Sequence, residues 1–107
     1  MKLLTEEMVR RFAAIGSQEG KGDDAVVVAK LFDPLGQWTW YLTEWDIETR
    51  EFFGLTSGFE VEWGYVSLDE LEEVGRRRRF VGIERDLHWN ECTIGDVRRA
   101  VSAGSRL

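Results

Sequence analysis

The stretch from Gln37 to Asp46 constrains the fold of this chain more than any other segment. It carries three of the five tryptophans within eight residues. Successive side chains of a strand point to opposite faces of its sheet, and here both faces carry large aromatic groups. The two sets are Trp38, Trp40 and Leu42 on one face, and Thr39, Tyr41, Thr43 and Trp45 on the other. The pattern therefore predicts that residues 37–45 form a strand inside the sheet, covered on both faces.

Other segments supply the neighbours of this strand. Residues 25–32 are a nearly continuous β-branched and apolar run, typical of a buried strand, and residues 33–36 have the sequence of a type I turn. These two strands should therefore form a hairpin. Residues 51–56 predict a third strand and residues 59–66 a fourth, while residues 81–89 are the candidate for a fifth. The fourth has the clearest half-buried pattern in the chain, because polar or small residues alternate with Phe59, Val61, Trp63 and Tyr65.

Three segments have the periodicity and the end signals of helices, at residues 5–15, 67–74 and 93–103. Each begins at a residue whose side chain can cap the first turn, namely Thr5, Ser67 and Thr93. Each is followed by glycine, which is common just past the last turn of a helix; these glycines are Gly16, Gly75 and Gly104. We therefore predict a single α+β domain over residues 1–107, in which the helices pack on a mostly antiparallel sheet of four or five strands.

Length and composition exclude several classes of protein. A chain of 107 residues with 43% hydrophobic residues fits one folded domain rather than a disordered segment. Its apolar runs are far shorter than the ~18 residues needed to cross a bilayer, and an N-terminus that turns acidic after residue 4 does not fit a signal peptide. Cys92 is the only cysteine, which excludes an intrachain disulfide and favours a reducing compartment. We therefore expect a cytoplasmic protein with no membrane segment.

The net charge of −6 is unevenly distributed along the chain. Residues 1–40 carry five Lys/Arg and six Asp/Glu, residues 41–75 carry Arg50 against ten acids, and residues 76–107 carry eight arginines against four acids. Such an asymmetry can steer a charged partner. Most exposed charges, however, are solvated or weakly paired, and this is the simpler interpretation for most of the charges here.

Several short motifs follow one another over nearly the whole chain: Met1–Leu4, Trp38–Asp46 (WTWYLTEWD), Phe52–Gly54 (FFG), Trp63–Leu71 (WGYVSLDEL) and Ile83–Leu87 (IERDL). On these motifs the chain resembles a small uncharacterised bacterial family, a domain of unknown function that is often encoded on plasmids and other mobile elements. The resemblance implies an accessory role in such an element and brings no established activity. The chain departs from the family before the Ile-Glu-Arg-Asp segment, where four arginines, Arg76–Arg79, replace a stretch that usually contains glycine and proline.

No set of residues in the sequence indicates a catalytic centre or a cofactor. The glycine-rich residues 16–24 lack the spacing and the Lys-Ser/Thr pair of a phosphate-binding loop. His88 and Cys92 are two ligands where a structural zinc site needs four, and proximity in sequence does not activate a thiol. A small metal-dependent enzyme or ligand-binding domain stays open as the alternative, because carboxylate oxygens suit Mg²⁺ or Ca²⁺. Its ligands would be two pairs on strand faces, Glu44 with Asp46 and Glu84 with Asp86.

Direct nucleic-acid binding is disfavoured despite the arginine run, because the chain is acidic overall and its aromatic strands carry the acids, which repel phosphate. The acids from Glu44 to Glu73 instead predict a negative face that docks on a basic protein surface. We therefore expect a non-catalytic protein-interaction or regulatory module that acts on a phosphate-binding or nucleic-acid-binding surface of a host protein. The sequence does not choose an oligomeric state. The candidate binding residues are Tyr41, Glu44, Trp45, Asp46, Glu84, Arg85 and Asp86.

Overall fold

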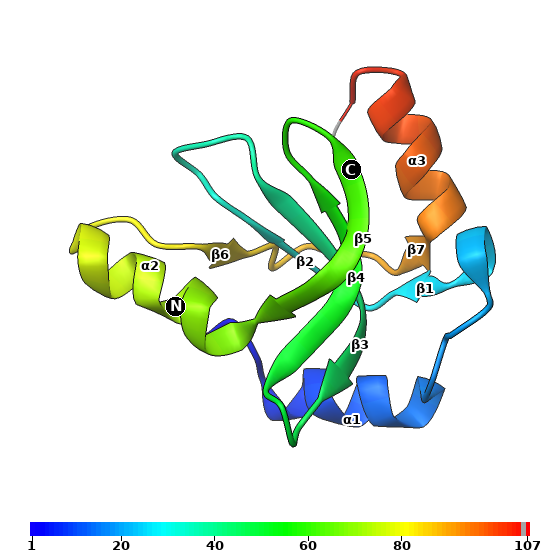
Figure 1. The fold of residues 1–107 in the computed structure, drawn as a ribbon, viewed down its shortest axis with the longest axis horizontal. Coiled ribbons are helices and arrows are strands. Elements are labelled where there is room, and N and C mark those ends of the chain that lie inside the picture. The colour runs from blue at the N-terminus through cyan, green and yellow to red at the C-terminus, as the bar shows by residue number, and fades with distance from the viewer. Residues whose placement is uncertain (106) are drawn as a thin grey trace.

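The computed structural model describes residues 1–105 and 107 and contains a five-stranded antiparallel sheet in the order β5-β4-β3-β2-β6 (Figure 1). Its strands are β2 (Ala29–Phe32), β3 (Thr39–Asp46), β4 (Glu51–Ser57), β5 (Val61–Ser67) and β6 (Glu84–Arg85). A separate two-stranded ladder pairs β1 (Val26–Val27) with β7 (Cys92–Thr93). The helices are α1 (Glu6–Ile15), α2 (Leu68–Arg78) and α3 (Ile94–Ser102), and a 3₁₀ turn spans Gly22–Asp24. The predicted α+β class and antiparallel sheet are confirmed.

The tryptophan strand, β3, is the middle strand of the five and separates two hydrophobic clusters. The first lies between the sheet and the helices α1 and α2, and its buried members are Leu3, Phe12, Val28, Ala29, Leu31, Leu42, Phe52, Leu68, Leu71 and Ile83. The second lies against α3 and contains Ala25, Val27, Tyr41, Leu55, Ile94 and Val97. Leu42 and Tyr41 are neighbours in sequence and belong to different clusters. The prediction of a strand covered on both faces is therefore confirmed.

All three helices begin where their capping residues predicted. The Thr5 hydroxyl accepts a hydrogen bond from the Met8 backbone N–H (3.2 Å), and the Ser67 hydroxyl accepts one from Glu70 (3.2 Å). Thr93 forms a complete capping box with Asp96, in which each side chain accepts from the backbone N–H of the other residue. These bonds satisfy amide groups that the first turn of a helix leaves unpaired. Helix starts were predictable because the chemistry is local.

The end of α2 differs from the prediction. The helix continues through Gly75 as far as Arg78, and Arg79 closes it in the left-handed conformation, with φ of 69°. Gly75 serves a different purpose, which is the close approach of the returning chain. A Cβ at Gly82 would lie 2.8 Å from the Gly75 Cα, so Gly82 must lack a side chain, whereas a Cβ at Gly75 would lie 3.5 Å from the Gly82 Cα, an ordinary contact distance. Three of the four arginines therefore belong to the last turn of α2, where cations suit the helix dipole.

Two predicted strands are shorter than expected. The segment 25–32 divides at Val28, because the chain changes partner there: Val27 pairs with Cys92, whereas Ala29 pairs with Leu42. In the segment 81–89 only Glu84–Arg85 pair with β2. A turn follows at once, in which the Asp86 carboxylate accepts from the His88 backbone N–H (2.9 Å). The fifth strand exists, but as two residues rather than nine.

Candidate binding groove

A bulge in β3 decides which side chains of the tryptophan strand face which side of the sheet. Leu42 pairs with Gly54 of β4, and the next pair is Glu44 with Phe53, so Thr43 is an extra residue. An extra residue reverses the alternation beyond it, which places Glu44 on the face opposite Leu42. Trp45 then packs on Phe52 in the first cluster, with ring centroids 4.7 Å apart. The predicted grouping of Trp45 with Tyr41 on one face was wrong for this reason.

Gln18 fixes the loop that follows α1 against this bulge. Its buried side chain donates from Nε2 to the carbonyl oxygens of Val26 (2.8 Å) and Thr43 (2.9 Å), and its Oε1 accepts from the Val26 N–H (2.6 Å). Its backbone N–H donates to the Glu44 carboxylate (3.2 Å). One residue therefore both positions the loop and orients the acid that the bulge has turned towards it.

Three aromatic side chains from β4 and β5 face this loop. The ring of Phe53 stacks on Trp63 with centroids 5.6 Å apart and an interplanar angle of 10°, and it meets Tyr65 edge-on at 4.9 Å. Trp63 keeps 38% of its surface exposed and Tyr65 keeps 72%. The sequence predicted that this face of the strand is buried, and that prediction was wrong. Helix α3 packs on Tyr41 and Leu55 nearer the middle of the sheet, which leaves the outer strand open to solvent.

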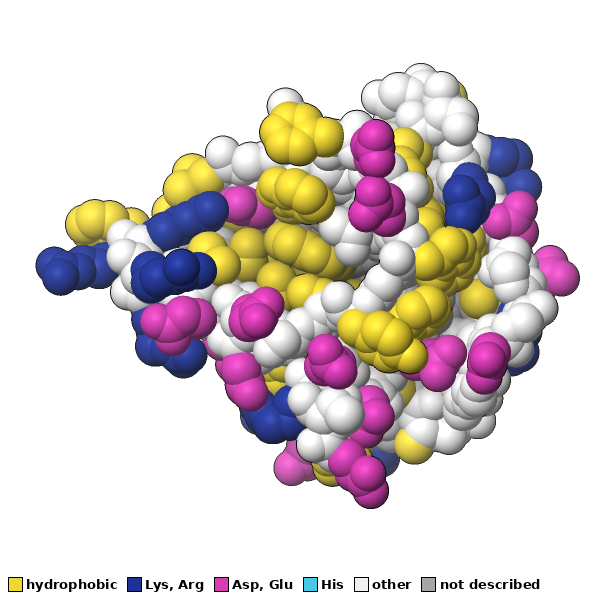
Figure 2. All heavy atoms as spheres, in the orientation of Figure 1, with side chains coloured by type: hydrophobic (Ala, Val, Ile, Leu, Met, Phe, Trp, Pro, Cys, Tyr) yellow, Lys and Arg dark blue, Asp and Glu magenta, His cyan; other side chains and the backbone are white. Residues whose placement is uncertain are grey.

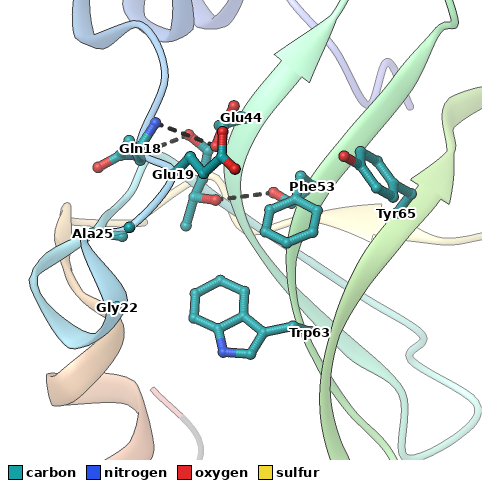
Figure 3. A pocket seen from close by; sticks show the side chains of 10 residues that line it. Gln18, Glu19, Gly22, Ala25, Glu44, Phe53, Trp63 and Tyr65 are labelled. Atoms are coloured by element: carbon teal, nitrogen blue, oxygen red, sulfur yellow. Dashed lines mark hydrogen bonds between the residues drawn. The ribbon is translucent and has the colours of Figure 1, made fainter.

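Between the loop and the rings lies a groove of about 480 Å³, which we call the aromatic–acid groove (Figure 3). The side chains of Glu19 and Glu44 lie near each other at one end of it and the Trp63 ring lies at the other. The Thr43 hydroxyl ties two of its strands together by donating to the Phe53 carbonyl oxygen (3.1 Å). Its lining comes from the segment between α1 and β1 and from three strands: Gln18, Glu19, Gly20, Gly22 and Ala25; Thr43 and Glu44 of β3; Phe53 of β4; and Trp63 and Tyr65 of β5.

The chemistry of this groove suits a cation. The face of an aromatic ring attracts a cation through its quadrupole, and a carboxylate attracts it through charge. The chain itself provides an example at the Trp63 end, where the guanidinium carbon of Arg98 lies 5.9 Å from the ring centroid while its Nε lies 3.2 Å from the Asp23 carboxylate. At the other end, the exposed Glu19 and Tyr65 offer the same two kinds of group to a cation from outside.

The predicted binding residues in the tryptophan strand have three different roles. Glu44 lines the groove and is half-buried. Tyr41 is fully buried in the second hydrophobic cluster and Trp45 packs against the first. Asp46 shapes the turn to β4, because its carboxylate accepts from the backbone N–H groups of Glu48 (2.9 Å) and Thr49 (3.4 Å). Of these four residues, the structure places Glu44 in the groove.

The other predicted residues, Glu84, Arg85 and Asp86, lie at the opposite edge of the sheet. Arg85 donates from Nε to the Lys2 carbonyl oxygen (3.2 Å), and the Asp86 carboxylate lies 3.8 Å from the Lys30 ammonium. Strand β2 separates β6 from β3, so the two predicted carboxylate pairs do not come together. Within residues 1–105 and 107, no three His, Cys, Asp or Glu side chains form a group that could hold a metal ion.

Cys92 has the environment of a structural rather than a reactive thiol. Burial raises the pKa of its thiol above the usual value, and the nearby Asp96 carboxylate raises it further. A raised pKa reduces the thiolate fraction at neutral pH, and the thiolate is the nucleophilic form. The neighbouring His88 is exposed. The structure therefore gives no support to nucleophilic chemistry at this position.

Sequence reasoning missed most of the groove. The alternation of aromatic and acidic residues in β5 was the available signal for Trp63 and Tyr65, and it was interpreted as a sign of burial. Phe53 was noted within a strand but not as part of a site. Gln18 and Glu19 lie in the glycine-rich residues 16–24, which the sequence excluded only as a phosphate-binding loop. The sequence of this loop does not show that the Gln18 side chain is buried and hydrogen-bonded to the backbone of Val26 and Thr43.

Comparison with known proteins adds a family but no activity. Residues 3–100 match the family model DUF2958, which is described as a protein of unknown function. The chain belongs to this family. The DUF2958 match spans all ten residues that line the groove. No curated protein matches the chain, and neither does any solved structure. No helix among the described residues is long and apolar enough to cross a membrane.

Proposed function

We propose that this DUF2958 protein is a non-catalytic protein-interaction module whose aromatic–acid groove receives a Lys or Arg side chain from a basic partner surface. The observation that carries the proposal is the presence of exposed rings, Trp63 and Tyr65, and of two carboxylates, Glu19 and Glu44, in one groove. A cation over an aromatic ring gains about 0.5–2 kcal/mol, depending on how far it is desolvated. The carboxylates add attraction and favour a basic side chain over a neutral one.

The distribution of charge around the groove supports the same partner. The segment 41–75, which supplies Glu44 and all three rings, carries ten acids and one arginine. In Figure 2, Asp and Glu side chains surround the apolar side chains over the middle of this face, whereas Lys and Arg gather at the end where α2 terminates and, in a second group, over α3. A basic surface is therefore steered towards the groove and away from the arginine-rich end of α2.

The setting of this interaction is also part of the proposal. The single cysteine favours the cytoplasm. The resemblance to a family found on plasmids suggests an accessory protein of a mobile element that acts on a host protein. Carboxylates can replace phosphates as partners of Lys and Arg, so an acidic groove could occupy a phosphate-binding surface of such a host protein.

Titration with poly-L-lysine at low salt, followed by tryptophan fluorescence, tests the groove. We expect the double variant Glu19→Gln, Glu44→Gln to bind at least about fivefold more weakly than the unmodified chain, because two attractive charges are removed. The matched control is Glu6→Gln, Glu48→Gln, which has the same net charge but changes exposed acids outside the groove. Equal weakening in both variants would mean that only net charge matters, and would overturn the proposal. Poly-L-glutamate should not bind either form.

A further inference from the structure

Strand β5 presents an open edge beside the groove. It is the outermost strand of the sheet, and it pairs with β4 without interruption from Val61 to Ser67. The strand at the other edge, β6, has only two residues. The outer side of an edge strand offers backbone N–H and C=O groups to an added strand. The sheet therefore has one long edge that can be extended and one that is too short.

The side chains of β5 leave this edge accessible on both faces of the sheet. On the groove face, Val61, Trp63 and Tyr65 are exposed. On the other face, Gly64 has no side chain to cover the backbone, and a Cβ at this position would have no neighbour within 4 Å. Natural sheets usually protect a long edge with proline, a lysine or a covering loop. Here the protection is acidic: Glu60 and Glu62 flank the edge.

These acids decide what kind of strand can be added. A second copy of this chain would bring its own Glu60 and Glu62, together with the rest of its acidic segment, against the same charges. Like charges on neighbouring strands are destabilising, and opposite charges are stabilising. The edge therefore disfavours self-association and favours a segment that carries Lys or Arg, which is the charge that the groove also selects.

We propose that the partner adds an extended segment as a sixth strand along β5, with Lys or Arg beside Glu62 and apolar or aromatic side chains beside Trp63 and Tyr65. This inference rests on the proposed function and names its binding mode. Adjacent strands lie ~4.8 Å apart, so the added strand lies about 14 Å from β3, beyond the reach of one arginine side chain to Glu44. The extended segment therefore contacts the edge, and a basic residue before or after it enters the groove.

Selection of random twelve-residue peptides displayed on phage, with the full chain as target, tests the proposal and supplies a defined ligand. We expect enriched sequences in which Lys or Arg alternates with β-branched or aromatic residues over at least five positions, because alternate side chains of a strand face the same side. Failure to enrich peptides would overturn this inference alone, because the poly-L-lysine titration tests the groove independently. Enrichment of peptides without basic residues would overturn both this inference and the proposed function.

Backbone methylation of the enriched peptide separates the two proposals. An added strand uses the N–H groups of alternate residues. N-methylation of one alternate set should therefore weaken binding by at least about tenfold, whereas methylation of the other set should have little effect. A peptide that binds equally well with either set methylated, and still loses affinity to the variant Glu19→Gln, Glu44→Gln, would leave the proposed function intact and overturn strand addition.

Two measurements on the protein complete the test. The variant Glu62→Lys should bind the unmodified peptide at least about tenfold more weakly than Glu48→Lys, which makes the same charge change in an exposed turn outside the edge. Bound peptide should also slow amide hydrogen exchange at every second residue of β5, because only the outward N–H groups acquire new partners. Protection confined to the loop and β3 would contradict the proposed mode.

Discussion

At the scale of single residues, Gln18 shows how one buried amide can build a binding site. Replacement by alanine removes three hydrogen bonds and leaves the backbone groups of Val26 and the carbonyl oxygen of Thr43 without this partner. We expect Gln18→Ala to lower the free energy of unfolding by about 2–3 kcal/mol, because unpaired buried groups keep their desolvation cost. Urea denaturation measures this directly. Gln37→Ala is the control: Gln37 is exposed, so the change should be below about 0.5 kcal/mol.

Two glycines that pair across β4 and β5 differ in whether the surrounding structure leaves room for a side chain. Gly54 pairs with Gly64, and neither has a positive φ. A Cβ at Gly54 would overlap the Tyr41 carbonyl oxygen and lie 2.9 Å from the Leu42 Cα, whereas a Cβ at Gly64 meets nothing within 4 Å. The bulge in β3 causes the difference, because it brings that backbone against Gly54.

The pair provides an internally controlled prediction. Gly54→Ala should destabilise the protein by about 2–3 kcal/mol, since the clash is with backbone and cannot be relieved by a rotamer change. Gly64→Ala should instead stabilise it by about 0.5 kcal/mol, because alanine reduces the conformational freedom of the unfolded chain. Thermal and urea unfolding of both variants give the comparison. Similar losses in the two variants would contradict the bulge geometry.

At the scale of elements, an ion pair joins the last turn of α2 to the β2–β3 hairpin. Both terminal nitrogens of the Arg78 guanidinium donate to the Asp33 carboxylate, at 2.8 and 2.9 Å. The hydrogen bonds from Arg78 lower the pKa of Asp33 below its usual value, and the Leu35 backbone N–H contributes in the same direction. Asp33 is buried. The extra turn that α2 makes beyond Gly75 is what brings Arg78 to this carboxylate.

The ion pair should make stability depend on pH in one direction. Because the pKa of Asp33 is lower in the folded chain than its unfolded value of ~3.9, the stabilisation is complete above that pH and is lost as the pH falls through the folded value. Asp33→Asn should therefore cost about 1–2 kcal/mol at pH 7, and the difference from the unmodified chain should shrink below about pH 4. Urea unfolding across this range measures the difference. Asp24→Asn, at an exposed acid, should show little effect at any pH.

Local chemistry explains which elements could be predicted from sequence. Helix starts depend on one side chain and the amide groups two or three residues later, so Thr5, Ser67 and Thr93 predicted them correctly. The central position of β3 followed from aromatic groups on both of its faces. The end of α2 was predicted wrongly, because Gly75 lies inside the helix, in contact with the returning chain at Gly82, and does not end it. The face of β5 that carries Val61, Trp63 and Tyr65 is exposed because α3 packs nearer the middle of the sheet and does not cover it. The sequence does not show how far a helix extends over a sheet.

At the scale of the whole molecule, stability and binding use different members of one aromatic set. Trp40 and Trp45 pack against the cluster beneath α1 and α2, whereas Trp63 and Tyr65 lie on the outer strand with much of their surface in water. Exposed aromatic groups that add little to the core are typical of interaction sites. The sequence predicted strands at all five tryptophans, but Trp38 and Trp89 lie outside the strands of the structure. It also predicted burial for the face of β5 that carries Trp63, because the sequence does not show how much of the sheet α3 covers.

This separation predicts opposite outcomes for two tryptophan substitutions. Trp40→Ala should lower the free energy of unfolding by about 3 kcal/mol, since it removes a large side chain from the first cluster, and should leave poly-L-lysine affinity unchanged under conditions where the protein is folded. Trp63→Ala should cost about 1 kcal/mol or less, because the ring is partly solvated in the folded chain, yet it should weaken poly-L-lysine binding several-fold. Urea unfolding of both variants measures the free energies of unfolding. Fluorescence titration, under conditions where each variant is folded, measures the affinities for poly-L-lysine. A Trp63→Ala variant that unfolds readily would assign this ring to the core, and one that binds normally would remove the rings from the binding surface.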